Sequence, residues 1–184
     1  MENLFFDLSK LKSCGANVII GKTVRIRYPE LVEIGDNVII DDFTYISTAL
    51  KLHSNIHISS GCKIIGGKKS FVEMHPFSTL APNVVLSAGS DDYIDGIATP
   101  LVPSRFKANA AIGKIIIKKH CIVGANSVVL PNVVFDEGST LGALSLANND
   151  LKEYKVYAGI PAKPIKERNK INILKLEKKL YEQD

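Results

Sequence analysis

The hydrophobic positions of this chain recur every six residues. The bulky members of the series are Ile34, Ile40, Ile46, Leu52, Ile58 and Ile64, and the count resumes as Ile117, Val123, Val129, Phe135 and Leu141. A compact side chain follows each by four positions: Val38, Thr44, Ile56, Cys62, then Ser78, Val84, Cys121, Ser127, Val133, Ser139 and Ser145. A helix repeats about every 3.6 residues and a half-buried strand every 2 or so. The hexad therefore describes a larger coil with two inward positions per repeat.

The second position of a hexad is often Gly or Asp, as at Gly35, Asp41, Gly124, Asp136 and Gly142. These residue types tolerate the tight bends that separate short strands. Three hexads close a triangular coil of about 18 residues, and coils stacked at roughly 4.8 Å bury one continuous apolar column. The pattern predicts an all-β fold, a parallel β-helix. It does not give the handedness, for which the general rule of parallel crossovers is right-handed.

The chain divides into four parts. We expect an N-terminal segment over 1–17, a β-helix over 18–164, a loop without hexads over 88–111 and a C-terminal helix over 165–184. Inside the β-helix, Tyr28–Leu31 inserts two residues and Gly66–Lys69 forms a bulge. Twenty-odd residues without a repeat are unusual in a compact domain unless they have a function. The loop is thus the first candidate for substrate contact.

The composition, 184 residues with 46% hydrophobic and 23% charged, fits one soluble domain. No apolar run approaches the ~18 residues of a membrane span, and the first residues are unlike a signal peptide, so we expect a cytoplasmic protein. Cys14, Cys62 and Cys121 lack metal-ligand spacing and are expected to be reduced core residues.

The net charge of +4 comes from lysines in the last third of the chain. Nucleic-acid binding would need a dense basic face interleaved with aromatic residues, which is not present. The lysines after Ile165 are expected on the solvated side of a helix that has Ile171, Leu174 and Leu180 on its other side. Lysines near the repeat can also form a phosphate-binding rim.

Three features together resemble the hexapeptide-repeat acyltransferases: the hexads, the long loop and the ending VYAGIPAKPIK. The motifs His57-Ile58, Gly66-Gly67 and Asp91-Asp92-Tyr93 are similar to those of enzymes that N-acetylate nucleotide-linked 4-amino-4,6-dideoxyhexoses in surface-polysaccharide (O-antigen) pathways. The resemblance implies a left-handed β-helix, a homotrimer with active sites between subunits, acetyl-CoA as donor and no metal.

The reaction needs a base and donors for the tetrahedral oxyanion. In many related O-acetyltransferases the base is a histidine just before the long loop, but here that segment reads Ser87-Ala88-Gly89-Ser90-Asp91. The resemblance then points to His57 as base, with Asp91 or Asp92 orienting it or binding the substrate ammonium. His75 is a weaker candidate, and His53 and His120 look like turn or surface residues. Because a neutral amine is already nucleophilic, the missing histidine favours N-acetylation over the alternative, sugar O-acetylation.

The resemblance also suggests binding residues. The expected CoA contacts are Gly124, Ala125, Gly142, Ala143, Asn148 and Lys163. Asp92, Tyr93 and Arg105 of the loop are the expected contacts of the nucleotide sugar, with Arg25, Arg27 and Phe106 as further possibilities. A lysine can meet a CoA phosphate as a point charge.

Two alternative functions outside the acyltransferases stay open. A γ-type carbonic anhydrase shares the β-helix and holds zinc with three histidines, but here only His57 and His75 have a matching spacing and the bulge shifts their register. A non-catalytic scaffold would leave the long loop and the small-residue turns unexplained.

Overall fold

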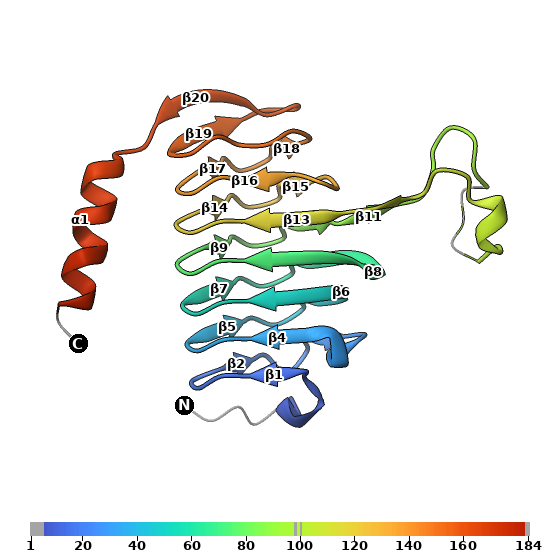
Figure 1. Ribbon diagram of the computed structural model, residues 1–184, viewed down its shortest axis with the longest axis horizontal. Coiled ribbons are helices and arrows are strands. Elements are labelled where there is room, and N and C mark those ends of the chain that lie inside the picture. The colour runs from blue at the N-terminus through green and yellow to red at the C-terminus, as the bar shows by residue number, and fades with distance from the viewer. Residues whose placement is uncertain (1–5, 98, 100, 183–184) are drawn as a thin grey trace.

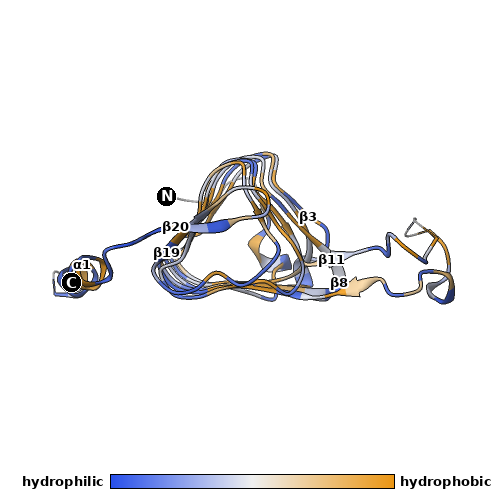
Figure 2. Cartoon of the chain, turned by 90° about the horizontal axis from the view of Figure 1, so that it is seen from above, coloured by the Kyte–Doolittle hydropathy of each residue, from blue (hydrophilic) through white to orange (hydrophobic). Residues whose placement is uncertain are grey.

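The chain folds into a triangular column of stacked β-coils (Figures 1 and 2). This computed structural model describes residues 6–97, 99 and 101–182. Strands of successive coils pair in parallel and in register, for example Val38 with Ile56 and Ile40 with Ile58. The predicted parallel β-helix is confirmed.

The column has three faces. The first face contains β1 (Ser13–Cys14), β4 (Val32–Ile34), the ends of β6 (Tyr45–Leu52) and β8 (Lys63–Met74), β13 (Lys114–Ile117) and β16 (Val134–Phe135). The second contains β3 (Arg25–Ile26), the starts of β6 and β8, β10 (Val85–Ser87), β15 (Val128–Val129) and β18 (Leu146–Ala147). The third contains β2 (Ile19–Ile20), β5 (Val38–Ile40), β7 (Ile56–Ile58), β9 (Thr79–Leu80), β14 (Ile122–Val123), β17 (Thr140–Leu141) and β19 (Lys155–Ala158).

The hexad residues form the core as predicted. Every bulky and every compact position named above is at most 3% exposed. The compact polar side chains bond to carbonyl groups at the bends, as when Ser127 Oγ donates to Gly142 O at 2.8 Å. Cys62 and Cys121 are buried free thiols, and burial raises the pKa of each to about 11, so both are inert core residues. Cys14 is also free but only partly buried.

The bends are made by the fourth residue of the hexad, three positions after the bulky residue, and not by the second residue of the hexad. Asn37, Asn55, Asn83 and Asn126 have φ between 55° and 60°, a left-handed conformation that asparagine tolerates well. Gly35 and Gly124 are not left-handed; a Cβ on Gly124 would lie 2.4 Å from Ala143 N of the next coil. The glycines at position two therefore serve close stacking between coils rather than the bend itself.

All three irregular segments lie at one corner, between the second and first faces, which we call the loop corner. They are η2 (Pro29–Leu31), the bulge within β8 and the long loop. In the loop, β11 (Gly89–Ser90) pairs antiparallel with β12 (Ala111–Ile112), and η3 (Ser104–Phe106) follows the outermost part. The absence of hexads there is confirmed. Figure 1 shows the loop extending far from the column.

The two ends differ from the predicted boundaries. The column begins at β1 rather than at residue 18, after η1 (Leu8–Lys10), because Ser13 and Cys14 already pair with β4. At the other end, Lys163–Glu167 forms β20, antiparallel to β19, and the helix α1 spans Lys170–Tyr181 instead of starting at Ile165. Asn169 caps it by accepting from Asn172 N at 3.0 Å. Pro164 lacks the N–H for a helix interior but fits an edge strand.

The helix α1 stands beside the corner between the first and third faces, opposite the loop (Figure 2), and we call this the helix corner. Glu177 holds it there through His120, at 2.9 Å, and through Lys119. The apolar side predicted for this helix is not buried: Ile171 is 82% exposed and Leu180 48%. Among the described residues, no helix is long and apolar enough to cross a membrane.

Candidate active site

A cavity of about 540 Å³ lies at the root of the long loop. Its walls come from the β8 bulge, from β11 and from the returning strand of the loop. The lining residues are Gly66, Gly67, Gly89, Ser90, Asp91, Ser104, Lys107, Ala108, Ala110, Ala111 and Ile112. The charged residues of this lining are one acid, Asp91, and one base, Lys107, so the cavity offers a ligand a partner of either sign.

The glycines of the bulge allow the loop to leave the column at this point. A Cβ on Gly89 would lie 2.7 Å from Gly66 O, and one on Gly66 would lie 2.8 Å from Ser70 Cβ. The buried Thr48 hydroxyl anchors the bulge, because Thr48 Oγ1 donates to Ser70 O at 2.7 Å and lies 3.1 Å from Gly67 O, its second acceptor. The cavity rim is thus fixed by backbone contacts that larger residues would prevent.

The two adjacent aspartates have different roles. Asp92 accepts hydrogen bonds from the backbone N–H groups of Ile94, Asp95 and Asn109 at 2.8–3.1 Å. These bonds hold the pKa of Asp92 below its usual range and tie the two ends of the loop together. Asp91 instead lines the cavity. Asp92 therefore closes the loop, whereas Asp91 lines the cavity, and its role in binding stays a prediction.

The other loop residues predicted to bind substrate lie on its outer part. Tyr93 is 88% exposed, and the Arg105 guanidinium stacks 4.7 Å from the centre of the Phe106 ring. Neither lines the cavity, whereas Ser104 and Lys107 do. Sequence reasoning missed these two, because nothing in the pattern shows which residues of the loop line the cavity.

His57 lies on β7 of the third face, away from the cavity lining. Its Nε2 is 2.8 Å from Asp41 Oδ2, and both side chains are about half exposed. Within one chain the carboxylate beside His57 is thus Asp41, not Asp91 or Asp92. The pair is an imidazole oriented by a carboxylate, the arrangement of a general base. His57 stays a prediction as the base.

The other three histidines also have carboxylate partners. His120 bonds to Glu177 and so belongs to the attachment of α1. His53 and His75 both lie beside Glu73, at 2.8 and 3.8 Å from Glu73 Oε1. None of these side chains lines the cavity.

The predicted CoA residues line up along the corner between the third and second faces. Gly124 N donates to Leu141 O and Gly142 N to Tyr157 O, so these two amides are used inside the column. The next amides, of Ala125 and Ala143, make no hydrogen bond within the described part of the chain. They form a ladder of available donors spaced by one coil, suited to the amide carbonyls of a pantetheine arm.

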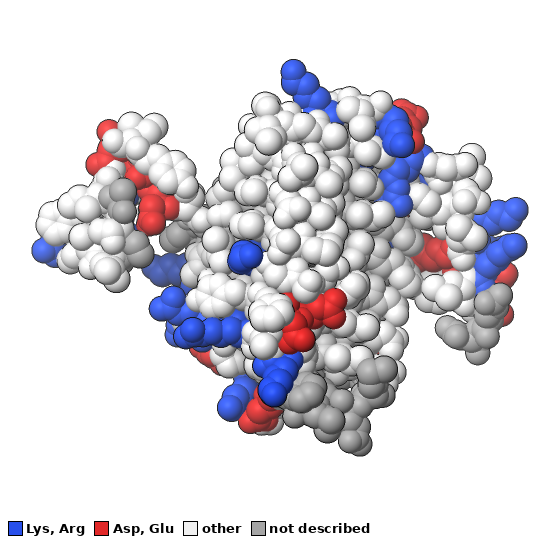
Figure 3. Space-filling model, turned by 180° about the vertical axis from the view of Figure 1, so that it is seen from behind, with Lys and Arg blue, Asp and Glu red and all other residues white. Residues whose placement is uncertain are grey.

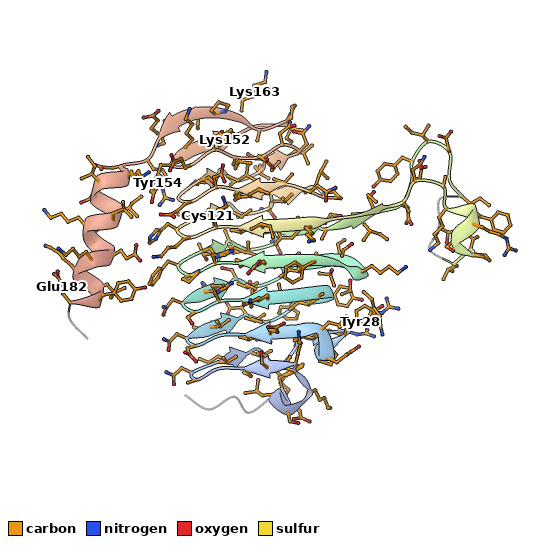
Figure 4. All side chains as sticks on the ribbon, in the orientation of Figure 1. Tyr28, Cys121, Lys152, Tyr154, Lys163 and Glu182 are labelled. Carbon is orange, nitrogen blue, oxygen red and sulfur yellow. The ribbon has the colours of Figure 1, made fainter. Side chains whose placement is uncertain are left out.

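Asn148 and Lys163 lie near the last coil. Asn148 is exposed and accepts from Asn149 Nδ2 at 3.0 Å. Lys163 begins β20, and its side chain projects from the end of the column into solvent (Figure 4). A charge in that position can meet a phosphate that extends beyond the coils.

Comparison with known proteins identifies the family. No protein-family model matches the sequence. The chain is 38% identical over 171 residues to the dTDP-4-amino-4,6-dideoxy-D-glucose acyltransferase of Escherichia coli, covering 90% of this chain and 86% of the relative. It also superposes on a point mutant of AntD, an N-acyltransferase from Bacillus cereus, in complex with dTDP-4-amino-4,6-dideoxyglucose and coenzyme A.

That comparison has a TM-score of 0.92 at 33% identity, with 100% of both chains covered. AntD in complex with dTDP and 3-hydroxybutyryl-CoA gives a TM-score of 0.91 at 34% identity, covering 99% of this chain and 98% of AntD. Both similarities include the long loop. The chain therefore belongs to the hexapeptide-repeat acyltransferases, and its β-helix is left-handed, as the resemblance implied.

Proposed function

We propose that this enzyme transfers an acetyl group from acetyl-CoA to the amino group of a dTDP-linked 4-amino-4,6-dideoxyhexose. The observation that carries the proposal is the agreement with AntD over the whole chain, loop included, since AntD is seen with such a sugar nucleotide and with coenzyme A. Asp91 in the cavity lining gives the amino group of such a sugar a carboxylate partner, while Lys107 adds a basic group beside it.

The amine nitrogen attacks the thioester carbonyl carbon, and the tetrahedral oxyanion collapses with expulsion of the CoA thiolate. The proton lost by nitrogen passes to a base and then to the thiolate sulfur. We assign the base to His57, oriented by Asp41, and binding of the substrate ammonium to Asp91. Since His57 and the cavity lie on different faces, they act together only across two subunits.

A homotrimer with active sites between subunits meets this requirement. The reverse side of the column, where the second and third faces meet, is largely uncharged (Figure 3). Phe43 and Leu144 are 72% and 68% exposed at that corner, and Ile39 and Ile122 are 38% and 37% exposed on the third face. Apolar residues exposed in one continuous region favour association. The loop of one subunit then reaches the third face of its neighbour.

CoA is proposed to lie along the corner of Gly124, Ala125, Gly142 and Ala143, with its pantetheine carbonyls on the Ala125 and Ala143 amides. Asn148 and Lys163 extend this track towards the CoA phosphates. Tyr93 and Arg105 are proposed to contact the nucleotide from the loop, while Asp92 keeps the loop closed. We place the enzyme in the cytoplasm, in a surface-polysaccharide (O-antigen) pathway.

The test is release of thiol from acetyl-CoA with a panel of acceptors, with products identified by mass. The panel contains dTDP-4-amino-4,6-dideoxyglucose, its 3-amino isomer, UDP-linked amino sugars, simple galactosides and maltose. We expect turnover on the first. Turnover on hydroxyl acceptors alone would replace N-acetylation by O-acetylation. A second donor, 3-hydroxybutyryl-CoA, tests the size of the acyl group.

The variant D91N checks the site. It keeps the size of the side chain and removes its charge, so we expect KM for the amino sugar to rise about tenfold or more while acetyl-CoA binding is unchanged. An unchanged KM would remove Asp91 from the site.

A further inference from the structure

Three side chains converge on the first face, near the helix corner and apart from the loop cavity. They are His53, Glu73 and His75, and the atoms they offer as ligands all lie within 4.8 Å of one another. The two imidazole rings are stacked, with centroids 4.6 Å apart and planes 14° apart. The side chains are 21–36% exposed, so an ion from solution can reach them.

The β-helix creates this cluster. Glu73 and His75 are two residues apart at the end of β8, so their side chains emerge on the same side of the chain. His53 follows β6 on the coil before, and its N–H bonds to Met74 O at 2.9 Å. The parallel register, with Leu52 opposite Met74, therefore stacks His53 under His75. Both imidazoles then compete for one carboxylate oxygen of Glu73.

We propose that His53 Nε2, His75 Nε2 and the Glu73 carboxylate bind a zinc-like divalent transition-metal ion, with solvent as the fourth ligand. Two histidines and one glutamate are a ligand set that Zn²⁺ accepts. In a tetrahedral site with bonds of about 2.1 Å, two ligand atoms lie roughly 3.4 Å apart. The ligand atoms of the cluster lie within 4.8 Å of one another. The widest pair must therefore close by up to about 1.4 Å, which requires rotation of the imidazole side chains.

The surrounding charges favour a transition metal over Mg²⁺ or Ca²⁺. The groups that face the cluster are Lys51 on β6, in register between Glu33 and Glu73, and Lys118, whose ammonium pairs with Asp136 at 2.8 Å. The cluster itself contributes one carboxylate, and the acids around it, Glu33 and Asp136, are next to these lysines, so it lacks the several carboxylates that a hard cation prefers. Nitrogen ligands instead select Zn²⁺, Ni²⁺ or Cu²⁺.

The protonation of His75 suits this role. Burial, and then the neighbouring His53, lower the pKa of His75, with Lys118 and Lys51 acting in the same direction and Glu73 against them. A neutral imidazole binds the ion without first losing a proton.

The ion would connect two successive coils and would not touch the reacting atoms, because none of its three ligands lines the loop cavity. Its expected effect is on the stability of the column. The proposal is therefore independent of the acyl-transfer reaction, and its test does not use that reaction as a readout.

The experiment is a Zn²⁺ titration of the chelator-treated full-length protein by calorimetry, with stoichiometry by native mass spectrometry. We expect one ion per chain, binding weakened at least tenfold in H75N and in E73Q, and unchanged binding in H57N. The last is a matched control, a half-exposed histidine 2.8 Å from a single carboxylate. Zn²⁺ should raise the Tm of the wild type and of H57N, but not that of H75N.

Circular dichroism of the variants checks that each is folded. If H75N is unfolded, the Zn²⁺ titration of E73Q tests the proposed site instead. Equal titrations of the wild type, H75N and E73Q, including the absence of binding in all three, would overturn the proposal. Loss of binding in H57N instead would assign the ion to the His57–Asp41 pair.

Discussion

Asp41 Oδ2 lies 2.8 Å from His57 Nε2, although the two residues come from different coils of the third face. If His57 is the base, Asp41 fixes the orientation of its ring. We expect H57N to lower kcat by about 10²-fold or more, the usual contribution of a general base. We expect D41N to lower it less, roughly tenfold, because the imidazole remains. The measurement is steady-state kinetics on the amino-sugar acceptor.

D42N provides the matched control for D41N. Asp42 points to the neighbouring coil, where it accepts from Thr23 N and Thr23 Oγ1, each at 2.8 Å. Its loss should lower the Tm and leave kcat unchanged. A kcat that falls equally in D41N and D42N would show that the effect is structural.

Thr48 supports the cavity rim through its hydroxyl. T48V keeps the shape of the side chain but leaves Ser70 O and Gly67 O without this donor. We expect a loss of about 1–3 kcal/mol in the free energy of unfolding, the cost of buried groups left unbonded, and a higher KM for the acceptor. Urea unfolding and acceptor kinetics measure the two effects. Stability loss with an unchanged KM would separate the bulge from substrate binding.

Gly124 and Gly142 occupy equivalent positions on successive coils but differ in the space around them. A Cβ on Gly124 would meet Ala143 N at 2.4 Å, whereas one on Gly142 would meet Ala158 Cβ at 3.2 Å. We expect G124A to displace the next coil, lower the Tm and raise KM for acetyl-CoA, and G142A to have a much smaller effect. Thermal unfolding and CoA titration compare the two. Equal effects would contradict the close stacking at Gly124.

Glu177 makes the attachment of α1 pH dependent. Burial raises the pKa of this carboxyl, but the hydrogen bonds from Lys119 and His120 outweigh it, and the net shift is downward from 4.5. Because the folded pKa is the lower one, the stabilisation is complete above pH 4.5 and is lost as the pH falls through the folded value. Hydrogen exchange of residues 170–181 should therefore accelerate in acid.

E177Q should produce the same acceleration at neutral pH, while the column keeps its protection. The matched variant E182Q removes a glutamate that pairs only within the helix, with Lys178 at 3.7 Å. Exchange that is equally fast in both variants would mean that α1 is not held by Glu177.

The core of this fold could be predicted from the sequence because each inward position is set by a local rule that repeats. Phe135 and Ser139 are both fully buried, as the hexad requires. The bends were assigned to the wrong position, since Gly35 suggests a left-handed turn while Asn37 makes it. The start of α1 was placed too early because Ile165 continues an apolar pattern that Pro164 and the pairing of β20 override.

The candidate site was harder to predict than the core, because its contacts join residues with no fixed spacing. Asp41 and His57 are 16 residues apart, less than one coil, and meet only because one follows a strand and the other lies within the next. Asp91 and Lys107 come to line one cavity through the fold of the loop. In contrast, the motifs that contain His57, Gly66 and Asp91 could be recognised from the sequence because they match short motifs of related enzymes. The match does not show how these residues lie relative to one another.

The concentration of every irregular segment at the loop corner bears on how such enzymes diverge. Residues added there leave the hydrogen-bond ladders of the three faces unbroken, since β8 resumes its register by Phe71 despite the bulge. Evolution can therefore change acceptor preference by insertion and deletion at a single corner, while the proposed CoA-binding corner and the core stay constant. Homologues that modify other sugars should differ in length between residues 88 and 111 and hardly at all between 117 and 147.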